Sequence, residues 1–198
     1  MIDTKGNVVG AILLLIAGAA IVAGALLDWF VLDTPAVAFE GGAVSGSYSG
    51  LDTGAFGWAA LAAGAIVVVA GLVWIATRSG GPASIIAVLA GVVAAGIGVY
   101  QLSRIDSAFV ELAASKSAND ELPADKITDL LTRLIDGGQM VVDPGIGVYL
   151  VLGGGIAAGL VGIIGVFRAG RDKEHSGYEA PAFTVPGGSP PEGLSTDR

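Results

Sequence analysis

The sequence contains no cysteine and a single histidine, His175. The absence of cysteine excludes disulfides, thiol catalysis and cysteine-ligated metals. Charged residues are also scarce, at 14% of the chain, whereas soluble domains carry about 25%. The net charge of −8 argues against a nucleic-acid partner, because phosphate binding needs clustered Lys and Arg. We therefore expect a chain that lies largely in lipid and holds neither a metal nor an organic cofactor.

Four long apolar runs predict transmembrane helices at 8–30, 55–77, 83–102 and 145–167. Each has roughly the 20 residues that cross the hydrocarbon core of a bilayer. Backbone groups find no hydrogen-bond partners in lipid, so such segments must be helical. The first run is longer than the apolar region of a signal peptide, about 7–15 residues, and we expect it to be retained. The fold class predicted is an all-α membrane protein, a four-transmembrane-helix bundle.

The segments between the spans differ in character. A short leader (1–7) and a tight turn (78–82) are polar, and the tail (168–198) is rich in Pro, Gly, Ser and Glu. Such a tail cannot bury enough apolar surface to order itself, so we expect it to be disordered. The two longer connections, 31–54 and 103–144, are expected to form a small cap outside the membrane.

The first long connection predicts a β-hairpin. Its β-prone runs, 36–40 and 43–48, flank Gly41-Gly42, and a Gly-Gly pair between two such runs favours a hairpin turn. The short apolar piece 139–142 can add a third strand. Trp29-Phe30, at the end of the first run, is interpreted as part of the aromatic belt at the membrane–water boundary.

The second long connection predicts helices. Apolar residues recur there with helical spacing, at Ile127, Leu130, Leu131, Leu134 and Ile135. This pattern predicts an amphipathic helix over 125–136, ended by Gly137-Gly138. The third span is expected to continue as a helix beyond the membrane, to about Lys116.

The distribution of basic residues predicts the orientation. The leader, the tight turn and the start of the tail carry Lys5, Arg78, Arg168, Arg171 and Lys173. The two long connections and the span ends beside them carry twelve acids against four bases, which accounts for the whole net charge of −8. Because Lys and Arg favour the cytoplasmic side, we expect a multi-pass plasma-membrane protein with both termini cytoplasmic.

Candidate functional residues are glycines of the last span and leucines of the amphipathic helix. No ionisable residue lies in mid-span, which argues against a proton relay or ion pathway. Gly155, Gly159 and Gly162 permit close approach of another helix, either from a partner protein or from the chain's own bundle. Leu130 and Leu134 can likewise cover the hairpin or meet a partner domain. No catalytic residues are expected.

The layout resembles a group of four-span membrane proteins common in actinobacteria. The resemblance lies in an aromatic pair ending the first span (Trp29-Phe30), a Ser-Gly-rich loop before the second (Ser45–Asp52), and a helical segment before the fourth. The topology is also similar to that of claudin-type proteins, with an outer hairpin and a short strand before the last span. The claudin Trp-Gly-Leu-Trp motif and loop cysteines are missing, so a role in cell contact is not implied. The resemblance implies a plasma-membrane setting and no reaction.

These observations predict a non-catalytic accessory or scaffold subunit of a larger plasma-membrane complex, such as an envelope transporter or a respiratory assembly. Its expected partners are the lipid bilayer and an integral-membrane protein. An alternative is a stand-alone transporter or binding protein for a small molecule or lipid, held between the spans and the cap. An enzyme at the outer boundary would have only carboxylates for catalysis, since no histidine or cysteine lies in the outer segments.

Overall fold

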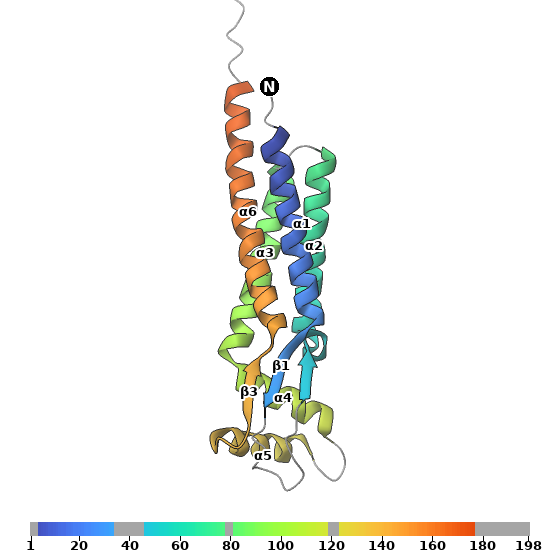
Figure 1. Ribbon diagram of the computed structural model, residues 1–198, viewed down its shortest axis with the longest axis vertical. Helices are drawn as coiled ribbons and strands as arrows, with labels where there is room; N and C mark the ends of the chain where they lie inside the picture. Colours follow the sequence, from blue (N-terminus) through green and yellow to red (C-terminus); the bar gives the residue numbers. More distant parts are fainter. Residues whose placement is uncertain (1–3, 34–45, 78–80, 119–122, 177–198) are drawn as a thin grey trace, which may run out of the picture.

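Four long helices form a bundle, and a small sheet with two short helices covers one end of it (Figure 1). The structure is a computed structural model in which residues 4–33, 46–77, 81–118 and 123–176 are described. In chain order the elements are α1 (Thr4–Leu26), β1 (Asp28–Asp33), β2 (Gly46–Ser49), the 3-10 helix η1 (Gly50–Thr53), α2 (Ala55–Thr77), α3 (Gly81–Ser103), α4 (Ile105–Ser117), α5 (Ala124–Asp136), β3 (Val141–Pro144) and α6 (Ile146–Ser176). We call β1, β2, β3, η1, α4 and α5 together the cap.

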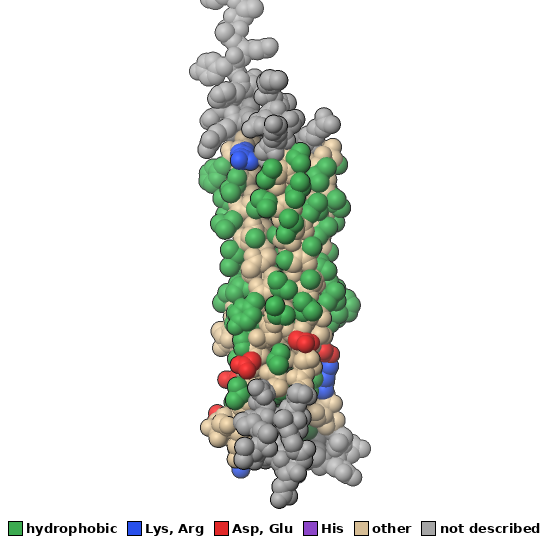
Figure 2. Space-filling view, viewed as in Figure 1, with side chains coloured by type: hydrophobic (Ala, Val, Ile, Leu, Met, Phe, Trp, Pro, Cys, Tyr) green, Lys and Arg blue, Asp and Glu red, His purple; other side chains and the backbone are tan. Residues whose placement is uncertain are grey.

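The helices α1, α2, α3 and α6 are each long and apolar enough to cross a membrane. Figure 2 shows hydrophobic side chains along the whole length of the bundle, with charged side chains only near its two ends on the face in view. Large apolar residues such as Leu72, Leu89 and Leu160 point outward, as expected for contact with lipid tails. The predicted fold, a four-helix membrane bundle with a small cap, is confirmed.

The four spans are arranged in a ring in which each contacts two neighbours, in the order α1, α2, α3, α6. The contacts are built from small residues, because lipid is as apolar as leucine and helices associate there by close backbone packing. Gly18 of α1 lies against Gly64 of α2, and Gly91 of α3 lies against Gly155 of α6. Substituting bulky residues at these positions would force the helices apart.

The cap sheet has three antiparallel strands in the order β2-β1-β3. A hairpin of β1 and β2 and a third strand are therefore present, with other bounds than predicted. The strand β1 lies before the predicted first run, β2 begins within the predicted run 43–48, and β3 begins two residues into the predicted piece 139–142. The first strand of the hairpin, β1, contains Trp29-Phe30, assigned from sequence to the end of the first span. The predicted strand 36–40 lies outside the described residues. Trp29 and Phe30 at the end of the apolar run enter the sheet and are buried there, whereas Val31 is exposed.

Trp29 joins the sheet to the bundle. Its side chain is 1% exposed, and its indole Nε1 donates a hydrogen bond of 2.8 Å to the carbonyl of Gly24. A methyl group added at Gly50 would lie 2.5 Å from the indole ring, so the absence of a side chain there makes room for it. The assignment of Trp29-Phe30 to an interfacial belt is wrong, because both side chains belong to the interior.

Aromatic packing holds the cap together. Phe109 of α4 is 2% exposed and makes edge-on contacts with Phe30 of β1 and Tyr48 of β2, with ring centroids 6.3 Å and 5.9 Å apart. The sheet and α4 thus share one small hydrophobic core. Removing its aromatic rings from water stabilises the cap.

The cap helices largely follow the sequence pattern. The third span does continue in helix, but the chain breaks at Arg104, which has φ −128° and ψ 29°, and α4 then runs across the end of the bundle (Figure 1). The amphipathic helix α5 matches its predicted range, and Gly138, with φ +67°, lies just beyond its end. The last helix continues through Ser176, so residues 168–176 are helical where disorder was expected.

Candidate functional site

The glycines of the last span mainly face α3 of the same chain. A methyl group at Gly155 would lie 2.5 Å from the backbone nitrogen of Ala95, and one at Gly162 would lie 2.8 Å from the carbonyl oxygen of Ser84. One at Gly159 would meet nothing within 4 Å. Gly155 and Gly162 thus already serve the internal packing of the bundle, and docking of a partner helix at these glycines stays a prediction.

The leucines of α5 lie at different depths. Leu131 and Ile135 pack against the hydrophobic core, and Leu134 is half-buried. Leu130 is 59% exposed. The amphipathic helix thus uses part of its apolar face to cover the cap and leaves Leu130 uncovered by the described residues.

A cavity of about 260 Å³ opens where the bundle meets the cap. One wall is formed by η1 and the first turn of α2, and the other by the last turn of α3 together with α4. Its polar side chains are Asp52, Thr53, Gln101, Arg104, Glu111 and Ser115. Both signs of charge therefore meet at one opening, at one end of the apolar bundle.

Asp52 is fixed on the first wall. Its carboxylate accepts hydrogen bonds from the backbone N–H of Ser49 at 2.9 Å and from the Ser49 hydroxyl at 2.8 Å, and it forms an ion pair with Lys116 of α4. These contacts, the Lys116 hydrogen bond first and the Ser49 hydroxyl second, lower the pKa of Asp52 from its usual value. The pair keeps Asp52 ionised and ties η1 to α4.

Arg104 stands on the opposite wall, at the break between α3 and α4. Its guanidinium donates to the Tyr100 hydroxyl and lies 5.5 Å from the centre of that ring. The Tyr100 ring stacks with Phe56 of α2 at a centroid distance of 5.2 Å. Among the described residues no carboxylate pairs with Arg104, although Glu111 lines the same cavity.

Gln101 lies between the two walls. Its side chain is 4% exposed, and its carbonyl oxygen Oε1 is buried without a hydrogen-bond partner among the described residues. Buried polar atoms are paired in the great majority of cases, because an unpaired one forfeits its hydrogen bonds to water. Because Gln101 also lines the cavity, a turn of its amide would let this oxygen accept a hydrogen bond from a polar group held there.

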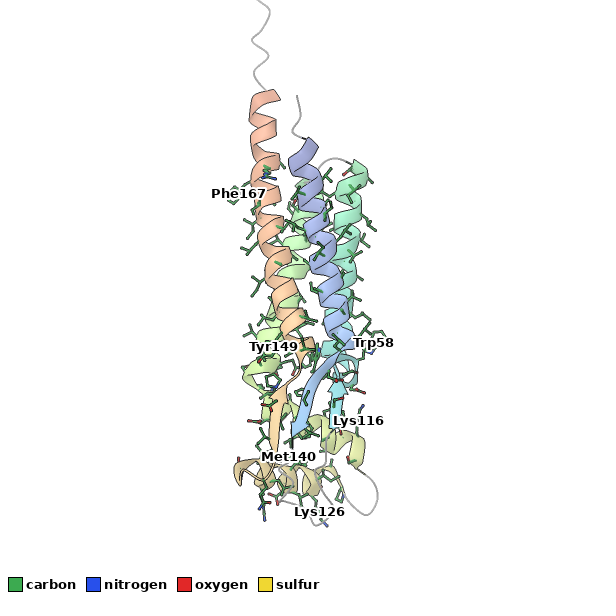
Figure 3. All side chains as sticks on the ribbon, in the orientation of Figure 1. Trp58, Lys116, Lys126, Met140, Tyr149 and Phe167 are labelled. Carbon is green, nitrogen blue, oxygen red and sulfur yellow. The ribbon has the colours of Figure 1, made fainter. Side chains whose placement is uncertain are left out.

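The cavity lies at the level where a bilayer would end. Trp58, near the start of α2, and Tyr149, near the start of α6, lie at similar heights beside the junction with the cap (Figure 3). Both are more than half exposed, and exposed aromatic rings favour the headgroup region of a membrane. Trp58 is therefore suited to that region. Trp74, at the other end of α2, is instead buried against Gly10 and Gly165.

Sequence reasoning did not find this cavity. In the sequence, Gln101 is one polar residue at a span end and Arg104 is one of four bases in the outer segments. Their spacing of three residues at the end of an apolar helix places both on one helical face. This spacing is the sequence feature that could have indicated a polar site. Asp52 and Phe56 come from a distant part of the chain, so their place in the cavity lining is known only from the folded structure.

The apolar bundle and its capped end define the class of this protein: it is an integral membrane protein with four helical spans. The chain matches no protein-family model and no curated protein sequence. The resemblance to actinobacterial four-span proteins therefore stays a prediction, and the similarity to claudin-type proteins is one of topology.

Proposed function

We propose that this protein is a non-catalytic accessory or scaffold subunit of a larger plasma-membrane complex, with its cap as the docking region. The observation that carries the proposal is α5, which has five apolar residues on one face and not one fully buried residue. Leu130 is the most exposed of the five. A helix with this pattern is completed by burial against another apolar surface.

The charge around α5 indicates the chemistry of the partner. The helix carries Asp125, Asp129 and Asp136 against Lys126 and Arg133, and Arg133 forms an ion pair with Asp129. A partner domain with an apolar contact and a basic rim would complement this surface. With both chain termini assigned to the cytoplasm by the positive-inside rule, such a domain would lie outside the cell.

The interior of the bundle supports a role without transport. The buried polar side chains of the described residues are Ser84 and Gln101, and no described Asp, Glu, Lys or Arg is buried. Ion-coupled transporters need ionisable groups at depth. The spans pack closely through glycines, and a scaffold role requires no change in this packing.

The test is purification from the native membrane in mild detergent through a tag on the C-terminal tail. We expect one integral-membrane partner at near-stoichiometric ratio, lost when Leu130→Glu places a charge on the apolar face. Thr132→Glu adds the same charge to an exposed, hydroxyl-bearing position of the same helix and should retain the partner. A monomer or homo-oligomer in the unmodified protein would refute the proposal.

A second candidate is a binding protein for a small molecule or lipid, working alone. The cavity between η1, α3 and α4 favours it, because its lining includes a buried acceptor and opposite charges. Transport through the spans has no such support.

A further inference from the structure

We propose that the cavity at the junction of bundle and cap binds the headgroup of a phospholipid that carries a primary ammonium group, as phosphatidylethanolamine does. The inference rests on the second candidate function and is independent of the accessory role. Three features of the cavity lead to it: the buried oxygen of Gln101, the charges of Arg104 and Glu111, and the aromatic pair at its edge.

The oxygen of Gln101 selects for a hydrogen-bond donor. Gln101 lines the cavity, and its Oε1 is buried with no partner among the described residues, so pairing it requires the side-chain amide to turn toward the cavity as the ligand binds. A primary ammonium group has three N–H donors, whereas the quaternary ammonium of a choline headgroup has none. A choline headgroup would therefore leave the oxygen unpaired, and an ethanolamine headgroup would not.

The two free charges match the two ends of such a headgroup. Glu111 lines the cavity and can face the ammonium group together with Gln101. Arg104 has no acidic partner in the described part of the chain and can bind the phosphate through its planar N–H groups. Asp52 is already occupied by Lys116. The vacant charges sum to zero, which favours a zwitterion over an anionic lipid.

The position of the cavity provides for the lipid tails. Phe56 and Tyr100 form part of its lining and remain about 40% exposed, stacked on one another beside the apolar surface of the bundle. Trp58, which is 60% exposed, follows Phe56 on α2 and lies at the junction in Figure 3. A lipid held by its headgroup in the cavity would leave the cap past these rings, with its acyl chains along α2 and α3.

The test compares lipids retained by the full-length protein. The protein is purified in detergent containing equal amounts of phosphatidylethanolamine, phosphatidylcholine and phosphatidylglycerol with matched chains, and the bound lipid is measured by native mass spectrometry. We expect the ethanolamine lipid to be enriched over the choline lipid on the order of tenfold, the factor set by one buried hydrogen bond. It should also exceed the anionic lipid.

Two variants assign the preference to the cavity. Gln101→Leu removes the acceptor while keeping an apolar side chain of similar size, and should abolish the enrichment. Gln139→Leu removes an exposed glutamine of the cap that does not line the cavity, and should preserve it. Arg104→Gln should lower retention of all three phospholipids.

The remaining outcomes are also decisive. Equal retention of ethanolamine and choline lipids, or an enrichment that survives Gln101→Leu, would overturn the proposal. Either result would mean that the Gln101 oxygen takes no hydrogen bond from a lipid and is paired with water instead. If soluble glycerophosphoethanolamine competes as well as the lipid does, the headgroup chemistry stands and the membrane source is refuted. Loss of lipid binding with an intact partner complex would leave the accessory role untouched, so the two proposals fail separately.

Discussion

Replacing Gly155 by alanine would place a methyl carbon 2.5 Å from the backbone nitrogen of Ala95 and 2.7 Å from the carbonyl oxygen of Gly91. Ordinary contact begins at 3.4 Å, so α6 and α3 would have to separate by about 1 Å. Overpacking of this kind costs about 1–3 kcal/mol. Backbone atoms cannot rotate away as a flexible side chain would, which favours the upper part of that range.

Gly159 provides the matched control, because it lies one helical turn along the same span. A methyl group there meets nothing within 4 Å. Both substitutions gain the same helix propensity, about 1 kcal/mol, and this gain cancels when the two variants are compared. We therefore expect Gly155→Ala to be less stable than Gly159→Ala by about 1–3 kcal/mol.

The assay is reversible unfolding in mixed micelles with increasing dodecyl sulfate, followed by tryptophan fluorescence. Trp29 and Trp74 are both buried and report on the two ends of the bundle. Equal stabilities for the two alanine variants would refute the reasoning, as would a Gly159→Ala protein that is the less stable of the pair.

Three further predictions concern the cap. Phe109→Ala should cost about 3–5 kcal/mol and speed amide hydrogen exchange in the cap without affecting the spans. Contact with Lys116 lowers the folded-state pKa of Asp52 from its usual value of 3.8. The stability that ionised Asp52 gives the cap is therefore complete above that pH and is lost as pH falls through the lower folded-state pKa. Proteolysis of the cap should therefore accelerate under acid in the parent protein, with a smaller pH response in Asp52→Asn. Trp29→Phe should cost about 1 kcal/mol by chemical unfolding, because the hydrogen bond to Gly24 is lost.

The sequence predicts the spans well, because crossing a bilayer imposes a length and a composition that few other structures share. The second span was predicted with the bounds that α2 has. The amphipathic helix was equally clear, since apolar residues at i, i+3, i+4, i+7 and i+8 have one simple helical interpretation. The third strand could be placed because it lies immediately before the last span.

The sequence predicts the junction poorly, because the residue types found there occur both at membrane interfaces and in protein interiors. Trp29 at the end of an apolar run is typical of an interfacial belt, and only the close approach of Gly50 and Gly24 shows that its indole is buried. The Gly155-x-x-x-Gly159 spacing likewise treats the two glycines as equivalent. Only the position of α3 distinguishes them, because a methyl group clashes at one and has room at the other.

The cavity lies beyond sequence prediction for a related reason. Gln101 and Arg104 can be placed on one helical face, but a buried oxygen without a partner is a property of the surroundings. Those surroundings come from η1 and from Phe56 of α2, which are distant in the chain and are brought close by the antiparallel pairing of α2 with α3.

The central strand of the sheet governs how the spans can move. β1 continues α1, β3 leads into α6, and β2 leads through η1 into α2, so the strand register sets the relative heights of three of the four helices. Sliding one of them by a residue would break the hydrogen-bond ladder. Changes in helix tilt must therefore pivot about the sheet and grow toward the opposite end. In the described part of the chain no strand leads into or out of α3, so its tilt is the least restrained by the sheet.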